Sequence, residues 1–580
     1  MTTYDKYPEI NVNGKNLFTC EGYEKIVTEL QRKLTSFPDK QILVIDCYPG
    51  VRYQEILNDL IEPLKPDLLI HSDDLAYSGE EISEKIQRNL TDDRVFGVLS
   101  CHRLEEFFDE NKVGNARENI ENIQSGLVVI YGVGASLVHE PNILMYLDLA
   151  RWEIQQRYRS KEIGNWKMEN IDEDILRKYK RGYFVEWRVA DRHKKTLFER
   201  MDFLLDTNKK NSPKMISGEA FLEGLKQAVN RPFRLVPYFD AGVWGGQWMK
   251  EVCDLNREQA NYAWSFDGVP EENSIYLKYG DIKIEVPSLN LVFRHPTELL
   301  GDKVHARFGT EFPIRFDYLD TMGGSNLSLQ VHPLTEYIQE NFGVAYTQDE
   351  SYYYMQAKED ATIYLGLKEG VDKEELIRDL KRAAAGEITF PDEKYINRIP
   401  AKKHDHFLIP AGTVHCGGAN GVILEISATP YIFTFKLWDW GRVGLDGLPR
   451  PVHIEHGEKN IIMERDEVWV ERELVNQIEK IEEGEGWVEE RTGLHSTQFI
   501  ETRRHWFTDK VTHHTNGSVN MMNLIEGDEV VITSPENTFE PFYVHYGETF
   551  IIPENVKVFE IAPSENAKAK EFATIKAYVR

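Results

Sequence analysis

The sequence predicts a multidomain protein: an N-terminal α/β domain followed by two β domains. At 580 residues the chain is too long for a single hydrophobic core. Its first part alternates short apolar runs with amphipathic helical patterns, which favours a parallel sheet flanked by helices. From about residue 230, glycine, proline and aromatic residues become frequent and short strand-like runs follow closely, as is typical of a β-barrel or sandwich.

The N-terminal domain is assigned to residues 1–225. Its strand candidates are apolar runs bounded by turns or charged segments: QILVIDC (41–47), PDLLIH (66–71), RVFGVLS (94–100) and SGLVVIYGVGASL (125–137). The segment VRYQEILNDLIEPL has helical periodicity and follows the first strand. The polar stretch DTNKKNSPKMISGEA then separates this domain from the β-rich part of the chain.

The middle domain is assigned to 230–475 and the C-terminal domain to 487–580. Strand-like runs in the middle domain include FPIRFDYLD, NLSLQVHP, SYYYMQA and GVILEIS, and the helical pattern GVDKEELIRDLKRAAAGE predicts a small helical insert. Asn420-Gly421, between two apolar runs, predicts a hairpin turn. A charged, helix-like stretch ending in IEEGEGW marks the second boundary near 480–487, after which β-like patterns return.

Composition excludes several function classes. The net charge of -28 argues against nucleic-acid binding, because a phosphate polymer needs a basic face, although a local pocket can still be positive. The five cysteines are scattered without a CxxC pair, which indicates free thiols in a reducing cytoplasm. We see no signal peptide and no apolar run long enough to span a bilayer. These features predict a cytoplasmic protein without nucleic-acid or membrane partners.

Four residues of the middle domain form a candidate metal site. In NLSLQVHP, Gln330 and His332 are two positions apart and project from the same face of a strand. Glu350 begins another strand, and His415 follows the Pro-Ala-Gly turn of HFLIPAGTVH. An amide oxygen, two imidazoles and a carboxylate suit a borderline divalent ion, with zinc as the first choice. A QxH pair alone is more often structural, so the prediction depends on the ordered set.

The middle domain resembles the type I mannose-6-phosphate isomerases. The resemblance covers roughly residues 230–470 and lies in VWGGQWM, FPIRFDYLDT, LSLQVHP, DESYYYM, ATIYLGL, INRIPAKKHDHFLIPAGTVH and GVILEIS, in that order. It implies a cupin barrel and one zinc ion held by Gln330, His332, Glu350 and His415. It also implies interconversion of an aldose phosphate and its ketose, most directly mannose 6-phosphate and fructose 6-phosphate.

Two positions depart from this family. The family usually has Lys two residues before the glutamate ligand, where this chain has Gln348. Its active-site Arg aligns with Lys436, while Asp439 and Arg442 keep the Asp and Arg that follow. Lysine retains the positive charge but loses the bidentate fork of arginine. Lys436 and Arg442 are therefore the candidates for stabilising charge during catalysis, against the alternative that both are solvated strand-end charges. The general base is not assigned.

The leading functional hypothesis is a zinc-dependent isomerase of a sugar phosphate that acts through an enediolate, with the metal as a Lewis acid. The two departures leave two alternatives open. One is isomerisation of a different or unphosphorylated sugar. The other is a non-catalytic sugar-phosphate sensor that retains the metal site and has lost turnover.

The flanking domains are expected to lack this chemistry. GETFIIP in the C-terminal domain parallels HDHFLIP, but Val558 stands where the first barrel has His415, so a metal-free cupin-like domain with a structural or dimer-forming role is expected. The N-terminal domain faintly resembles uridine kinase-like P-loop proteins. Its first turn, DCYPGVRYQE, has no GxxxxGK[ST], so it has no functional phosphate loop. Phosphate sensing, assembly or packing remain open as its role.

Overall fold

The computed structural model describes residues 3–15, 17–429, 433–493 and 495–580. Contacts divide the chain into two compact units. An α/β unit comprises Glu9–Gln227 and Ser274–Arg294, and a β unit comprises the rest. The two predicted β domains thus fall within one unit. Residues 274–294, which the sequence places in the middle domain, belong to the α/β unit.

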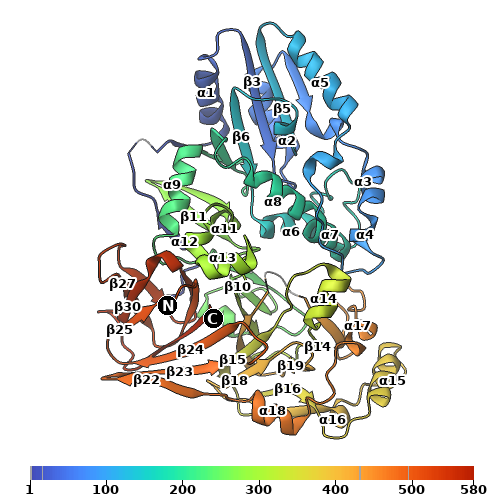
Figure 1. Cartoon of the computed structure of the whole chain (residues 1–580), viewed down its shortest axis with the longest axis vertical. Helices are drawn as coiled ribbons and strands as arrows, with labels where there is room; N and C mark the ends of the chain where they lie inside the picture. Colours follow the sequence, from blue (N-terminus) through green and yellow to red (C-terminus); the bar gives the residue numbers. More distant parts are fainter. Residues whose placement is uncertain (1–2, 16, 430–432, 494) are drawn as a thin grey trace. The chain divides into compact units, whose positions relative to one another are not determined.

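The α/β unit is built on a sheet with the strand order β2-β8-β7-β6-β3-β5-β4. Figure 1 labels its strands β3, β5 and β6. The strands are β2 (Thr19–Glu21), β3 (Lys40–Cys47), β4 (Leu68–His71), β5 (Gly126–Gly132), β6 (Ile143–Asp148), β7 (Phe203–Asp206) and β8 (Lys214–Ser217). Neighbours from β4 to β7 pair in parallel, as predicted. Strands β8 and β2 add antiparallel pairs that the sequence did not predict. The sheet is therefore mixed.

The sequence explains the central strands and the helices that cover them. Strand β3 is buried along its last six residues, as expected where helices cover both faces of a parallel sheet. Helix α1 (Tyr23–Leu34) buries Ile26, Val27, Leu30 and Leu34, an i, i+4, i+8 stripe on one side. Helix α5 (Glu110–Asn122) begins at Asp109, whose side chain accepts from the N–H groups of Asn111 and Lys112.

The run RVFGVLS is not a strand, contrary to the prediction. Its backbone hydrogen bonds go to separate residues and do not form the ladder of a sheet. The Val98 N–H donates to the Asn89 carbonyl, and the Ser100 N–H donates to the Phe184 carbonyl. The strand in the sheet is β6, whose apolar run leads almost directly into α6 (Arg151–Arg159). Strand length and apolarity alone do not distinguish a buried loop from a strand.

The glycine-containing turn after β5 holds an internal carboxylate. Asp46, at the end of β3, accepts hydrogen bonds from the N–H groups of Gly134 and Ser136 at 3.2 and 2.9 Å, and from the Ser136 hydroxyl at 2.6 Å. His193 Nε2 lies 2.9 Å from the same carboxylate. Gly134 has φ +69°, a left-handed conformation that glycine adopts readily. These N–H groups are thus engaged by Asp46 and are not available to a phosphate.

The first part of the β unit contains two antiparallel sheets. One has the order β18-β15-β20-β13-β10-β9 and the other β17-β16-β19-β14-β21. Their bounds are β9 (Tyr238–Asp240), β10 (Trp264–Gly268), β13 (Arg315–Asp320), β14 (Leu329–Val331), β15 (Glu350–Ala357), β16 (Thr362–Leu367), β17 (Ile396–Pro400), β18 (His406–Ile409), β19 (His415–Gly417), β20 (Gly421–Ser427) and β21 (Phe435–Trp438). The side chain of Glu350 meets those of His332 and His415, so the two sheets face each other at this point.

Two local predictions have different outcomes in these sheets. The predicted helical insert is α15 (Lys373–Ala384), which is capped by the Asp372 side chain (Figure 1). The Asn420-Gly421 turn forms with Asn420 at φ +67°, but it does not join a hairpin. It connects β19 of one sheet to β20 of the other, because the flanking runs pair with other partners.

The C-terminal part of the β unit has two more antiparallel sheets, with the orders β22-β23-β24-β31-β26-β29 and β25-β30-β27-β28. Their bounds are β22 (Glu479–Gly484), β23 (Trp487–Gly493), β24 (Ile500–Phe507), β25 (Val511–His514), β26 (Asn520–Glu526), β27 (Glu529–Thr533), β28 (Phe542–His545), β29 (Thr549–Ile552), β30 (Val558–Pro563) and β31 (Phe572–Val579). Both sheets contribute to one apolar core that includes Phe507, Met522, Phe550 and Phe559. The charged stretch at the predicted boundary is a hairpin, β22–β23, and not a helix.

Among the residues that the structure describes, no helix combines the length and apolarity needed to cross a membrane.

We expect Asp46 to stabilise the α/β unit. Asp46→Asn removes the charge and places an NH₂ group against backbone donors, so the free energy of unfolding of this unit should fall by roughly 3 kcal/mol, the scale for removing one partner of a buried charge network. Urea denaturation followed by circular dichroism measures this. Asp59→Asn, at an exposed position, is the matched control. A loss no larger than that of the control would contradict the role of Asp46.

The loss should also depend on pH. Burial lowers the pKa of His193, but the charge and hydrogen bond of Asp46 raise it by more. The ion pair therefore contributes fully below the unfolded pKa of about 6.5 and is lost as the pH rises through the raised folded value. The stability difference between wild type and Asp46→Asn should be larger at pH 6 than at pH 9.

Candidate metal centre

Three of the four predicted ligands come together between the facing sheets. Within the described residues, one group of histidine, cysteine or carboxylate side chains could hold a metal ion, and it consists of His332, Glu350 and His415. Their ligand atoms all lie within 4.8 Å of one another. His332 Nε2 is 3.2 Å from Glu350 Oε2, and His415 Nε2 is 2.8 Å from Glu350 Oε1. All three residues are buried, with exposed fractions of 2% or less.

Backbone carbonyls fix the tautomers of both histidines. His332 Nδ1 lies 2.9 Å from the Phe433 carbonyl oxygen, and His415 Nδ1 lies 2.9 Å from the Thr413 carbonyl oxygen. A carbonyl only accepts, so each Nδ1 carries a proton and donates it, and in the neutral imidazole each Nε2 is then a lone pair directed inward. This is the arrangement in which protein histidines ligate metals.

The inward atoms form a set of lone pairs without donors. Among the described residues, His332 Nε2, His415 Nε2 and Glu350 Oε1 have no hydrogen-bond partner, although all three are buried. When both imidazoles are neutral, the close N–O contacts are not hydrogen bonds, since neither Nε2 then has a proton to donate. Three buried lone pairs facing one another are costly unless a cation lies between them. The residues therefore fit a divalent metal ion with nitrogen and oxygen ligands.

Gln330 lies beside this group on β14. Its Cα is paired with that of His415 on one side and with that of Lys436 on the other. The Gln330 amide nitrogen is 3.5 Å from the Tyr352 hydroxyl, which leaves the amide oxygen as an available ligand. Gln330 therefore stays a proposed fourth ligand.

The charge around the site also favours a cation. In the described structure, four buried carboxyl groups (Asp317, Asp349, Glu350 and Glu425) surround it, with two buried guanidinium groups (Arg315 and Arg465). Burial raises the pKa of Asp317 to about 7 and that of Asp349 to about 6. Burial also raises the pKa of Glu350, but His332 and His415, when they are protonated, lower it by more through their charge and their hydrogen bonds. The pKa of Glu425 is also raised by burial, so binding of a divalent cation would be accompanied by loss of protons from these carboxyl groups.

The turn that presents His415 is anchored from a distant segment. Arg465 Nη1 donates to the carbonyl oxygens of Pro410 and Ala411 at 2.7 and 2.6 Å, and to the Thr413 hydroxyl at 2.5 Å. Gly412 has φ +90° at the sharpest point, which explains the glycine in the Pro-Ala-Gly sequence. Arg465 therefore holds the carbonyl-rich turn whose Thr413 oxygen orients His415.

Lys436 and Arg442, the two predicted charge-stabilising residues, have different surroundings. Lys436 is partly buried and pairs with Gln330 across the strands, which places it next to a proposed ligand. Arg442 donates to the Ser325 hydroxyl at 3.0 Å and to the Asn326 carbonyl at 2.7 Å, and it forms an ion pair with Asp439. Its guanidinium is thus largely engaged in holding the loop after β21, which makes Lys436 the better candidate to meet a substrate.

Sequence reasoning missed the polar contacts behind the ligands. Arg315 Nη1 lies 3.0 Å from Glu425 Oε1, and Gln348 Nε2 lies 3.1 and 3.2 Å from oxygens of Glu350 and Glu425. The available signal was a charged residue in an otherwise apolar strand, as in GVILEIS and FPIRFDYLD. Their partners lie on strands distant in the sequence, so the signal marks the residues without identifying what they contact.

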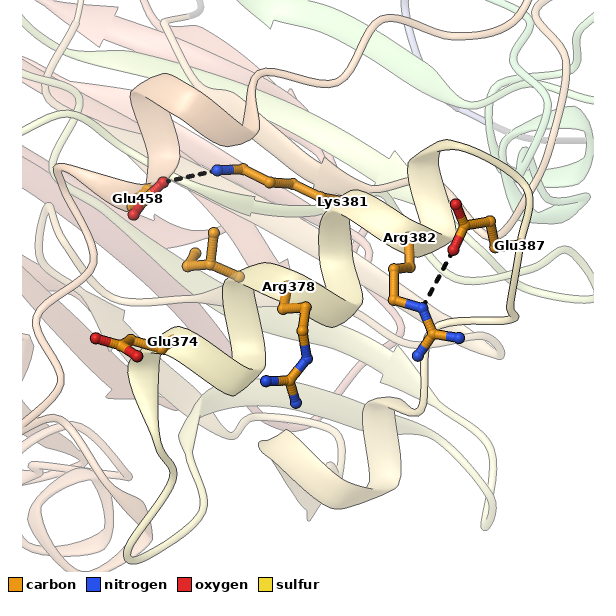
Figure 2. A pocket seen from close by; sticks show the side chains of 7 residues that line it. Glu374, Arg378, Lys381, Arg382, Glu387 and Glu458 are labelled. Atoms are coloured by element: carbon orange, nitrogen blue, oxygen red, sulfur yellow. Dashed lines mark hydrogen bonds and ion pairs between the residues drawn. The ribbon is translucent and has the colours of Figure 1, made fainter.

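A hollow at the helical insert differs from the metal site, because its charged side chains pair with one another. It has a volume of about 460 Å³ and lies along α15 (Figure 2). Its charges pair with one another: Lys381 Nζ is 3.3 Å from Glu458, and Arg382 Nε is 3.2 Å from Glu387. These are exposed ion pairs of low energy, and they neutralise basic side chains that would attract an anion if they were unpaired.

Comparisons with known proteins match separate parts of the chain. Residues 22–230 match a family described as a domain of unknown function, DUF8485. The chain is 28% identical over 227 residues to mannose-6-phosphate isomerase ManA of Bacillus subtilis (strain 168) and 31% identical over 215 residues to mannose-6-phosphate isomerase of Streptococcus mutans serotype c. These alignments cover 39% and 37% of this chain. They cover 66% and 62% of the relatives, so the chain spans just under two thirds of their length.

Two solved structures are also similar. A crystal structure of mannose 6-phosphate isomerase from Bacillus subtilis aligns with a TM-score of 0.49 at 18% identity, over 60% of this chain and 99% of that one. A zinc-bound mannose 6-phosphate isomerase aligns with a TM-score of 0.46 at 15% identity, over the same shares of the two chains. The comparisons give no support to the resemblance of the N-terminal domain to uridine kinase-like proteins, which stays a prediction.

We expect His332→Ala to lose the metal. Wild-type protein purified with zinc should hold one ion per chain, and removal of one imidazole from three converging ligands should leave the site without stoichiometric metal. Elemental analysis of dialysed protein measures this. His514→Ala, which truncates an exposed histidine on β25, should keep its zinc. A His332→Ala protein that still holds one ion would show that the ligands lie elsewhere.

Proposed function

We propose that this protein is a zinc-dependent aldose–ketose isomerase acting on a sugar phosphate, with mannose 6-phosphate and fructose 6-phosphate as its substrate pair. The observation that carries the proposal is the set of three buried lone pairs at His332, Glu350 and His415. The similarity to mannose-6-phosphate isomerases over the β-rich part of the chain supports the choice of reaction.

The residues that would hold the zinc ion are His332, Glu350 and His415, with Gln330 as the proposed fourth. When bound, the ion supplies Lewis-acid stabilisation for negative charge on the substrate oxygens. The chain's own residues supply the rest: the facing sheets exclude water from the three ligands, and the carbonyls of Phe433 and Thr413 orient the imidazoles through their Nδ1 protons.

Lys436 is proposed to stabilise the charge that develops when the proton next to the carbonyl is removed. Its position opposite Gln330 places a cation beside the metal ligands. Burial and then the charges of Arg450 and Arg442 lower its pKa to about 7, against the opposing effect of Asp439. Its charge therefore titrates near neutral pH. Arg442, with most of its donors engaged, is proposed to act by holding the loop that carries Asp439.

We also propose that the two parts of the β unit have different roles. The chemistry belongs to residues 230–475 with a cupin barrel, and residues 487–580 form a metal-free cupin-like domain that supports the first or mediates a homo-oligomer. The C-terminal core is built from apolar side chains such as Phe507 and Phe559, which fits a structural role. The five cysteines are free among the described residues, which supports a reducing, cytoplasmic location.

A second candidate is a sugar-phosphate sensor, or an isomerase of a different sugar. It is favoured by Gln348 and Lys436, which stand where the resembling family has Lys and Arg. Because these positions lie beside the ligands, their replacement can alter proton transfer or substrate choice while the metal site persists. Product formation distinguishes an isomerase from a sensor.

The test is an assay that couples fructose 6-phosphate formed from mannose 6-phosphate to a dehydrogenase. We expect turnover that a chelator abolishes and zinc restores, because the ligand set is incomplete as a charge-stabilising site without its ion. Binding of mannose 6-phosphate without product, in protein that holds one zinc ion, would favour the sensor. Full turnover after verified removal of the metal would contradict the proposal.

The role of Lys436 predicts a pH dependence. If its charge is required, kcat/KM should fall as the pH rises through about 7, since deprotonation removes the cation. Lys436→Arg stays protonated and should abolish this fall, while Lys436→Met should lower kcat/KM about 100-fold. Lys459→Arg, at an exposed position, is the control. An increase in kcat/KM through the same pH range, lost in Lys436→Arg, would identify Lys436 as a base instead.

A further inference from the structure

We propose that Gln348 is a positioning residue of the metal centre, which occupies one oxygen of Glu350 and thereby leaves the other as the single oxygen available to the metal ion. The inference rests on the metal site of the proposed function. It concerns a position where the resembling family would place lysine, and it assigns to this chain a different way of orienting the same ligand.

The Gln348 amide is buried and has partners on both sides. Its exposed fraction is 2%. Its nitrogen donates to Glu350 Oε2 at 3.1 Å and to Glu425 Oε1 at 3.2 Å, and its oxygen accepts from the Phe433 N–H at 2.7 Å. The opposite orientation would place the amide oxygen against two carboxylates and the NH₂ group against an N–H. The network therefore determines which end of the amide faces Glu350.

This contact distinguishes the two oxygens of Glu350, which are chemically equivalent in isolation. Oε2 accepts from Gln348 and lies 3.2 Å from His332 Nε2, whereas Oε1 has no hydrogen-bond partner among the described residues and lies 2.8 Å from His415 Nε2. A carboxylate held at one oxygen cannot rotate freely about its terminal bond. Oε1 is thus the oxygen that Gln348 leaves free for an ion.

The same amide acts on His332 through the backbone. Phe433 donates its backbone N–H to the Gln348 amide oxygen, and its carbonyl oxygen accepts the Nδ1 proton of His332. Gln348 therefore holds the residue that sets the tautomer of one ligand, while it also holds an oxygen of another. The chain of contacts from Glu350 through Gln348 and Phe433 to His332 closes around the position where the three lone pairs meet.

An amide of this length makes these contacts at once. Lysine has donors for the carboxylates but no acceptor for the Phe433 N–H, and an ionised glutamate has the acceptor but no donor. An ammonium would also add a positive charge beside the metal position. Glutamine keeps the negative charge of Glu350 available to the ion, and this is the physical consequence of the replacement.

The test compares Gln348→Met with wild type by chelator competition for zinc and by the visible spectrum of the cobalt(II) protein. Methionine has a similar length but cannot make the hydrogen bonds. We expect zinc affinity to fall about 10- to 100-fold, the range for losing a group that orients a ligand. The cobalt spectrum should weaken toward that of a higher coordination number, because Oε2 becomes free to bind as well. Gln356→Met, on β15 with a side-chain hydrogen bond to the Tyr546 hydroxyl, should leave both unchanged.

Gln348→Leu supplies a second variant, which lacks both the donors and the acceptor. Its cobalt spectrum should change as in Gln348→Met. The inference is overturned if wild type binds one metal ion and both variants keep the wild-type cobalt spectrum, or if Gln348→Met keeps the wild-type zinc affinity. If wild-type protein binds no metal, the metal site itself is wrong, which is a separate failure.

Discussion

Two hydrogen bonds to backbone carbonyls determine what the centre of the β unit can do. They place the protons of His332 and His415 on Nδ1, so that both Nε2 atoms present lone pairs to Glu350. With the other tautomer, each N–H would donate to the carboxylate and the cluster would be a closed hydrogen-bonded triad without a place for a cation. The carbonyls belong to Phe433 and Thr413, so the chemistry depends on two segments of backbone as much as on the ligands.

The charged groups around Glu350 also favour a cation at this position. Carboxyl groups buried beside Glu350 exceed the buried guanidinium groups, and burial raises the pKa of Asp317 and Asp349 toward neutral values. Such a cluster is unfavourable when it is dry, and protonation or a cation relieves it. The fold fixes this imbalance because Arg315, Asp317 and Glu425 occupy neighbouring strands whose inner faces are set by the alternation of side chains.

The sequence allowed prediction of the ligands because their signals are local. Gln330 and His332 are two residues apart, and His415 follows a turn that can be recognised by its Pro-Ala-Gly sequence. The residues that orient them could not be predicted, since Gln348 contacts Phe433 across 85 positions and Glu425 across 77. The fold shows the same limit. The parallel strands and the helical insert were read from periodicity, whereas the antiparallel strand β8 and the role of Asn420-Gly421 depend on pairings that periodicity does not contain.

X-ray absorption at the zinc edge of the loaded protein shows whether a metal ion binds the inward lone pairs of two histidines and Glu350. We expect a shell of nitrogen and oxygen atoms at about 2.0–2.2 Å, with the outer-shell scattering of imidazole rings and no sulfur. Cys416 follows His415 directly and is fully buried, so it is the nearest alternative ligand in the sequence. A sulfur shell at about 2.3 Å, or the absence of imidazole scattering, would contradict the account.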